Sequence, residues 1–290
     1  MIAIGQAGGF SAGIDPQGAQ LSWLRDSKGR DMLWDGDAAW WTGRAPLLFP
    51  IVGRLRDDRY RLGTRAFSLP KHGFARTSRF EAVSAEPDSA VFRLTANDET
   101  RACYPFEFVL DVAFSVSATG LAMTATVANG GSVPMPASFG FHPALRWPLP
   151  EAGLRAGHVL RFDAAEPCDI RRIDANALLS GHEPSPVRDK QLELRDELFV
   201  ADALIFTELH SRGLCYRGPR GAGLRIDWTG LPHLGVWTKP GAPYLCVEPW
   251  HGYNDTEGFT GDLFEKPGIF VVPPGGLWVG SMSIGDVTTP

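Results

Sequence analysis

Strict alternation of apolar residues over positions 106–129 is the strongest constraint on the fold. Every second residue is apolar from Phe106 to Val116, and the same spacing runs from Leu121 to Val127 after a short turn. A period of two places these side chains on one face of an extended strand. We therefore predict two adjacent β-strands, at residues 106–116 and 121–129, each with one buried face.

Strand-length segments bounded by turn residues recur along the whole chain. The sequence contains 33 glycines and 23 prolines, which suits many short strands joined by turns. No low-complexity linker or internal repeat divides it. We therefore predict a single domain over residues 1–290, built as one large antiparallel β-sandwich. Further strands are predicted at residues 18–24, 60–62, 65–69, 80–83, 90–94, 203–209, 223–228, 234–238, 269–272 and 277–284.

Two segments are less regular. Residues 46–55 are apolar but contain Pro46 and Pro50, which cannot donate to a sheet ladder, so we expect an edge strand or a loop there. Residues 186–204 have a helix-like composition. The part from Leu192 to Phe199 fits a strand end and one helical turn equally well.

Composition argues against several classes of partner and location. The net charge is -5 with acidic and basic residues interspersed, so neither nucleic acid nor a membrane surface is expected as a partner. The N-terminus lacks the features of a signal peptide, and we expect a cytoplasmic protein. The four cysteines are scattered without a C-x-x-C pair, which predicts reduced, buried thiols.

Glu248 stands where an apolar strand-forming segment, Tyr244 to Val247, ends. A carboxylate buried at a strand end needs a partner or a function, because an unpaired buried charge is costly. Trp250 and Tyr253 follow it and could form a floor for a sugar ring. The alternative is a structural glutamate hydrogen-bonded to nearby backbone.

Four segments combine an ionisable residue with aromatic, Gly or Pro neighbours, and together they resemble a known family. From about Gly18 to the C-terminus the chain resembles the aldose 1-epimerase (galactose mutarotase) family, in particular its shorter bacterial branch. Each motif alone is weak, but four in the family's order at comparable separations are strong. The motifs are LFPIVGRL, LPKHGFAR, FGFHPALR and CVEPWHGYND.

The resemblance implies an all-β fold, the galactose mutarotase-like β-supersandwich, with mostly antiparallel strands and few short helical turns. It implies an isomerase that interconverts the α and β anomers of a free aldose by ring opening and reclosure. Glu248 matches the general base and His142 the general acid. The residues that match sugar-binding positions are Arg54, His72, Arg76 and, most loosely aligned, Asp202.

A carboxylate and an imidazole suit this proton transfer at neutral pH, so neither a cofactor nor a metal is expected. The seven histidines show no H-x-H or H-E-x-x-H spacing, which also argues against a metal site. The expected partner is a small-molecule aldose, and the expected state is a monomer or homodimer. We predict that Glu248 and His142 converge on opposite sides of one small pocket.

Structural interpretations of the same residues stay open. His142 could be a core histidine, His72 a turn residue and Asp202 a turn cap. Arg54 and Arg76 could be surface partners of nearby acids such as Asp57, Asp58 or Glu81, and Trp237 could belong to the core.

Two functional alternatives also stay open. One is a non-catalytic carbohydrate-binding sandwich protein. The other is a hexose-6-phosphate 1-epimerase, which resembles this chain at HGFAR, where Arg76 would hold the phosphate. The second arginine of that branch is replaced by Thr42, with Arg44 displaced by two positions. Since a dianion calls for two cationic partners, a neutral aldose is favoured.

Overall fold

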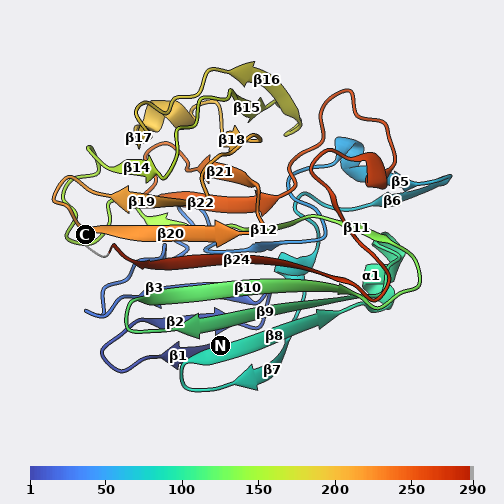
Figure 1. Cartoon of the computed structure of the whole chain (residues 1–290), viewed down its shortest axis with the longest axis horizontal. Coiled ribbons are helices and arrows are strands. Elements are labelled where there is room, and N and C mark those ends of the chain that lie inside the picture. The colour runs from blue at the N-terminus through green and yellow to red at the C-terminus, as the bar shows by residue number, and fades with distance from the viewer. Residues whose placement is uncertain (288–290) are drawn as a thin grey trace.

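Two large antiparallel sheets dominate the computed structural model of this chain, which describes residues 1–287 (Figure 1). The strands of the nine-stranded sheet are β7 (Glu81–Ala85), β8 (Ser89–Thr95), β9 (Phe108–Val116), β10 (Gly120–Asn129), β14 (Val159–Phe162), β17 (Gln191–Glu193), β19 (Gly213–Arg217), β20 (Gly223–Thr229) and β24 (Leu277–Asp286). Their order across the sheet is β17-β14-β19-β20-β24-β10-β9-β8-β7.

The eight-stranded sheet carries the site described below. Its strands are β4 (Leu47–Leu48), β12 (Phe139–Phe141), β13 (Ala144–Arg146), β15 (Ile170–Ile173), β16 (Leu179–Glu183), β18 (Leu204–Phe206), β21 (His233–Trp237) and β22 (Tyr244–His251). The order is β16-β15-β18-β21-β22-β12-β4, and β13 also pairs with β22. In Figure 1 most of these strands lie above β24, β10, β9 and β8.

Smaller elements complete the fold. Three small sheets are formed by β1 (Ile2–Gly5), β2 (Ser11–Asp15) and β3 (Gln20–Arg25), by β5 (Arg59–Leu62) and β6 (Arg65–Ser68), and by β11 (Met135–Ala137) and β23 (Phe270–Val272). The helical segments are α1 (Asp98–Cys103) and the 3-10 turns η1 (Arg56–Asp58), η2 (Ala75–Thr77), η3 (Asp196–Phe199) and η4 (Leu263–Glu265).

The alternating segment forms the predicted pair of strands. β9 and β10 are adjacent, with Leu121 opposite Val116 and Val127 opposite Leu110. All four of these side chains are buried in the main hydrophobic core. The predicted one-sided burial is confirmed, because a period of two sends alternate side chains to the core and to the opposite face.

The structure also agrees with the reading of the two irregular segments. Leu47 and Leu48 form β4, which lies at the edge of the eight-stranded sheet and is followed by a cis peptide bond between Phe49 and Pro50. The segment from 191 to 199 contains a short strand, β17, followed by the turn η3 rather than a longer helix.

Some elements were not expected from the sequence. Helix α1 has only 6 residues, and a capping box between Asn97 and Thr100 defines its start. Six residues are too few for a helical hydrophobic period to show. The prediction of buried thiols was wrong for three cysteines, since only Cys246 is fully buried. All four are free, as predicted.

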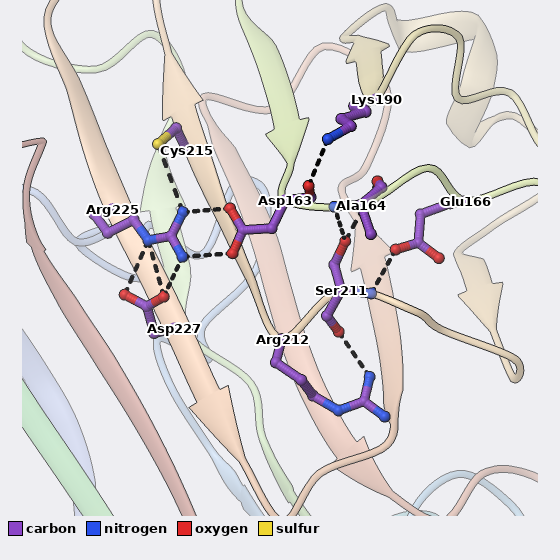
Figure 2. A network of polar contacts seen from close by, with 9 residues as sticks. All are labelled: Asp163, Ala164, Glu166, Lys190, Ser211, Arg212, Cys215, Arg225 and Asp227. Atoms are coloured by element: carbon purple, nitrogen blue, oxygen red, sulfur yellow. Dashed lines mark hydrogen bonds and ion pairs between the residues drawn. The ribbon is translucent and has the colours of Figure 1, made fainter. Parts of the chain in front are cut away.

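A polar network joins the ends of β14 and β20 across β19 (Figure 2). Arg225 donates to both carboxylate oxygens of Asp163 at 2.6 Å and also pairs with Asp227. Nearby, the buried carboxylate of Glu166 accepts hydrogen bonds from the backbone N–H groups of His210 and Ser211. These contacts tie the segment after β14 to β20 and to the segment before β19. Within residues 1–287, no helix has the length and apolar character needed to span a membrane.

Candidate active site

A cavity of about 160 Å³ opens beside β22 and collects most of the predicted functional residues. Aromatic side chains supply apolar surface and several ionisable side chains share the lining, a combination typical of small-molecule sites. The lining residues are Trp41, Pro46, Lys71, His72, Arg76, His142, Ile173, Asp202, Ala203, Ile205, Trp237, Glu248, Trp250 and Asn254.

Glu248 reaches the cavity because of the alternation within β22. Leu245 and Val247 point into the main core, whereas Cys246, Glu248 and Trp250 belong to the opposite face. β22 is a central strand between β21 and β12, so its backbone position is held from both sides. The residue exposes only 2% of its surface. The carboxyl group is therefore both fixed and largely removed from water.

His142 is brought to Glu248 by a break between two strands that both pair with β22. β12 ends at Phe141 and β13 begins at Ala144, which lies opposite Cys246. His142 and Pro143 occupy the interval between them. His142 Nε2 lies 3.1 Å from Glu248 Oε2, and its Nδ1 is buried without a hydrogen-bond partner. The two groups share one cavity, as predicted, but they lie side by side and not on opposite sides.

Burial acts on the two groups in opposite directions. Loss of hydration raises the pKa of Glu248 well above its usual value, and the positive charge of Lys71 partly opposes this. Loss of hydration lowers the pKa of His142 to about 3, and the charges of Lys71 and Arg76 lower it further. Each group alone resists ionisation here. A single proton shared by the pair keeps its net charge the same whichever group carries it.

His72 presents a defined tautomer to the cavity. Its Nδ1 accepts a hydrogen bond of 3.0 Å from the backbone N–H of Gly53, so the proton of the neutral ring is on Nε2. Burial is the main reason that the pKa of His72 is well below the usual value. The backbone N–H of His72 also donates to the Gly53 carbonyl. This reciprocal pair fixes the ring as a hydrogen-bond donor toward the cavity.

Gly53→Ala is expected to destabilise the protein and disturb His72. Gly53 has a φ of +75°, and an added Cβ would lie 2.3 Å from the Asn254 side chain. Backbone strain of this kind costs about 1–3 kcal/mol, and the clash adds to it. Gly63→Ala is the matched control, because Gly63 has a φ of +58° with no atom within 4 Å of the new Cβ. Urea unfolding measures the free energy of unfolding of the two variants. An equal loss of stability in Gly53→Ala and Gly63→Ala would contradict the proposed clash.

Arg76 and Asp202 both lie at the cavity. Arg76 is half-buried, donates from Nη2 to the carbonyl of Lys71 at 2.8 Å, and makes no ion pair with an acid in the described part of the chain. Asp202 has a φ of +66°, and its Oδ1 accepts a hydrogen bond from the N–H of Ala203. The turn-cap interpretation of Asp202 is therefore compatible with a place in the cavity wall.

Arg54 is not brought to this cavity. Its guanidinium pairs with Asp58 at 2.8 Å and lies on a neighbouring surface depression with Asn176. The surface-pair interpretation describes Arg54 better than a role in sugar contact, and we leave it out of the proposed site. The backbone carbonyl of Arg54 accepts a hydrogen bond from the N–H of Asp255, and this bond helps to hold the loop that carries Asn254.

Several lining residues were missed by sequence reasoning. Lys71 directly precedes His72 in the LPKHGFAR motif and is, with Arg76, one of two cations that line the cavity. Trp41 packs near His142 with ring centroids 5.2 Å apart, and its loop is tied to Trp34 Nε1 through the Trp41 carbonyl. Trp237, interpreted as core, lines the cavity beside Trp41. The adjacency of Lys71 to a predicted site residue was the only local signal for any of them.

Comparisons with known proteins show the family and the fold of this chain. The aldose 1-epimerase family profile matches residues 1–259. The chain is 32% identical to protein LacX (chromosomal) of Lactococcus lactis subsp. lactis over 268 residues, 89% of this chain and 90% of that one. A galactose mutarotase-like protein from Lactobacillus casei superposes with a TM-score of 0.92 at 28% identity and 99% coverage of both chains. A galactose mutarotase related enzyme from Lactobacillus acidophilus gives 0.88 at 28% identity, covering 99% of this chain and 97% of that one. With its all-β galactose mutarotase-like fold, this chain belongs to the aldose 1-epimerase family.

Proposed function

We propose that this protein is an aldose 1-epimerase that interconverts the α and β anomers of a free aldose. Glu248 acts as the general base and His142 as the general acid. The observation that carries the proposal is the 3.1 Å separation of His142 Nε2 and Glu248 Oε2 in the lining of a cavity that also contains aromatic side chains. Family membership supports the same reaction class.

Ring opening needs two proton transfers around one carbon. Glu248 takes the proton of the C1 hydroxyl while His142 gives a proton to the ring oxygen. The C1–O5 bond breaks and the C1=O1 bond forms. Because both oxygens are bonded to C1, an acid and a base that lie side by side can serve them. Positioned groups of this kind contribute about 10²–10⁴-fold each to the rate.

Reclosure uses the proton arrangement that opening leaves behind. After opening, Glu248 carries the proton and His142 is neutral. Rotation about C1–C2 presents the other carbonyl face; His142 then accepts the proton of the ring hydroxyl and Glu248 returns its proton to O1. The net charge of the pair is the same before and after opening, but burial favours the state after opening, in which Glu248 is protonated and His142 is neutral. Lys71 stabilises the carboxylate form that starts the reaction.

The remaining lining residues suit a sugar ring. Trp41, Trp237 and Trp250 offer apolar surface for the ring's C–H faces. We assign His72, Arg76 and Asp202 to the sugar hydroxyls, with His72 Nε2 as a donor and the Asp202 carboxylate as an acceptor. Asn254 is a further polar neighbour.

The test is anomer exchange by NMR on freshly dissolved single-anomer sugars. We expect catalysed exchange of at least one neutral aldose from a panel that includes galactose and glucose. A protein that binds an aldose without accelerating exchange would instead be the carbohydrate-binding alternative. A protein that does neither would contradict the proposal.

A phosphorylated hexose is the second candidate substrate. The observation that favours it is that Lys71 and Arg76 both line the cavity, which provides the two cations that a dianion requires. Against it, Thr42 supplies no charge, and Arg44 donates to the carbonyl of Ser22 and does not line the cavity. A neutral aldose therefore stays the first choice.

Arg76→Gln separates the two candidates. If the substrate carries a phosphate, KM for the hexose 6-phosphate should rise about 10- to 100-fold, because a hydrogen bond to a charged group contributes about 1.5–3 kcal/mol. KM for the free hexose should change much less. Exposed Arg79→Gln, three residues further on, is the control. A much lower KM of the unaltered enzyme for the hexose 6-phosphate than for the free hexose would identify the phosphorylated sugar as the substrate. Equal KM values for both would favour the neutral aldose.

A further inference from the structure

Cys246 adds a third metal-binding side chain to the pair formed by Glu248 and His142. One donor atom from each of the three residues lies within 4.8 Å of the other two. All three residues are buried. Cys246 and Glu248 are alternate residues on one face of β22, and His142 faces them from the break between β12 and β13. The spacing of histidines in the sequence could not reveal this cluster, because its members are brought together by strand pairing.

We propose that Cys246, Glu248 and His142 bind a single Zn²⁺ ion, which blocks the site and holds the enzyme in an inactive form. One thiolate, one imidazole and one carboxylate make a ligand set that zinc accepts, with the fourth position left for water. Tetrahedral zinc bonds place ligand atoms about 3.3–3.8 Å apart. His142 Nε2 and Glu248 Oε2 are 3.1 Å apart, and all three donor atoms lie within 4.8 Å of one another. Small side-chain adjustments would bring these distances into the range for zinc.

Charge balance favours this ion in a buried site. Zn²⁺ carries two positive charges, while the Cys246 thiolate and the Glu248 carboxylate each carry one negative charge. The complex with neutral His142 has no net charge, which limits the cost of removing it from water. Binding releases the thiol proton, and the proton shared by the pair, to solvent.

The ion has a route to the cluster and a defined effect there. Glu248 and His142 line the cavity, and an ion held by them comes within reach of Cys246 Sγ. Zinc would occupy the lone pairs of Glu248 and His142 that hold the transferred protons during the reaction. The binding of zinc does not depend on the proposed function, whereas the inhibition rests on it.

Equilibrium dialysis against Zn²⁺, followed by elemental analysis, tests the binding. We expect one Zn²⁺ per chain, with affinity reduced by about 100-fold or more in Cys246→Ala and in the nearly isosteric Cys246→Ser. Co²⁺ used as a probe should give a thiolate charge-transfer absorption that Cys246→Ser loses. Cys168→Ala is the matched control, because Cys168 lies 3.9 Å from His210 at another position and should not affect the site.

The binding and activity measurements test the two parts of the proposal separately. No bound zinc, unchanged binding in both Cys246 variants, or loss of binding in Cys168→Ala would overturn the proposal. For activity, Zn²⁺ should suppress anomer exchange reversibly, a chelator should restore it, and each Cys246 variant should need about 100-fold more zinc, relative to its own zinc-free rate. Exchange unaffected by a bound ion would overturn the inhibitory role. Zinc binding without any exchange in zinc-free protein would instead contradict the proposed epimerase function.

Discussion

Glu248→Gln is expected to lower the rate of anomer exchange by about 10²–10⁴-fold while the protein stays folded. Glutamine keeps the shape of the side chain but cannot accept the proton of the C1 hydroxyl. The fold should tolerate the change, because a buried carboxyl group whose ionisation is disfavoured is replaced by a neutral amide. NMR anomer exchange measures the rate, and thermal unfolding measures the stability.

The control for this variant is Glu81→Gln. Glu81 is exposed on β7, at the far edge of the nine-stranded sheet, so exchange should stay at the level of the unaltered protein. If Glu248→Gln keeps its exchange rate within a few-fold, Glu248 is not the base. If it unfolds, sugar binding by a Glu248→Asp variant that keeps the charge shows whether the site or the fold was lost.

Lys266→Met is expected to have the largest effect on stability, a loss of about 3–5 kcal/mol in the free energy of unfolding. Lys266 is buried, and its Nζ donates to Asp255 Oδ1 at 2.6 Å and to the Tyr253 carbonyl at 2.7 Å. Removing the amine leaves the buried Asp255 carboxylate without its cation. Asp255 Oδ2 also accepts the N–H of Arg56, which joins this loop to the segment after Gly53.

The double variant Lys266→Met/Asp255→Asn tests this explanation. It removes the unpaired carboxylate charge of Asp255 and should recover part of the lost stability. The effects of the two substitutions on the free energy of unfolding should therefore not be additive. Urea unfolding of the two single variants and the double variant gives the coupling energy. A loss below about 1 kcal/mol for Lys266→Met, or strict additivity, would show that the pair does not stabilise this loop.

Local patterns in the sequence predicted the strands well where one face is buried. Phe108 to Val116 follows the alternation residue by residue, and β4 lies at a sheet edge as its two flanking prolines require. Short elements gave weaker signals. The first two strands, Ile2–Gly5 and Ser11–Asp15, and helix α1 were missed because each covers too few residues for a period to stand out.

The candidate site could be predicted in part. The family resemblance pointed to Glu248, His142, His72, Arg76 and, by the loosest alignment, Asp202, and the structure gathers all five around one cavity. Their roles stay proposals until the variants are measured. Arg54 was included on the same basis, and tertiary structure places it beside Asp58 instead. A motif indicates which residues lie near a site, but not the direction in which each side chain points.

The sequence by itself determined the all-β class, because alternation along a strand is a local property that needs no knowledge of the partner strand. It also singled out ionisable residues, Glu248 among them, but it placed Glu248 at a strand end, whereas Glu248 lies within β22, which runs from Tyr244 to His251. Only the tertiary structure decided which of them meet. The pairing of β12 and β13 with β22 sets His142 beside Glu248 and Cys246, and the bond between Gly53 and His72 turns a second imidazole toward the same cavity. Such contacts depend on register between segments far apart in the chain, which local composition does not encode.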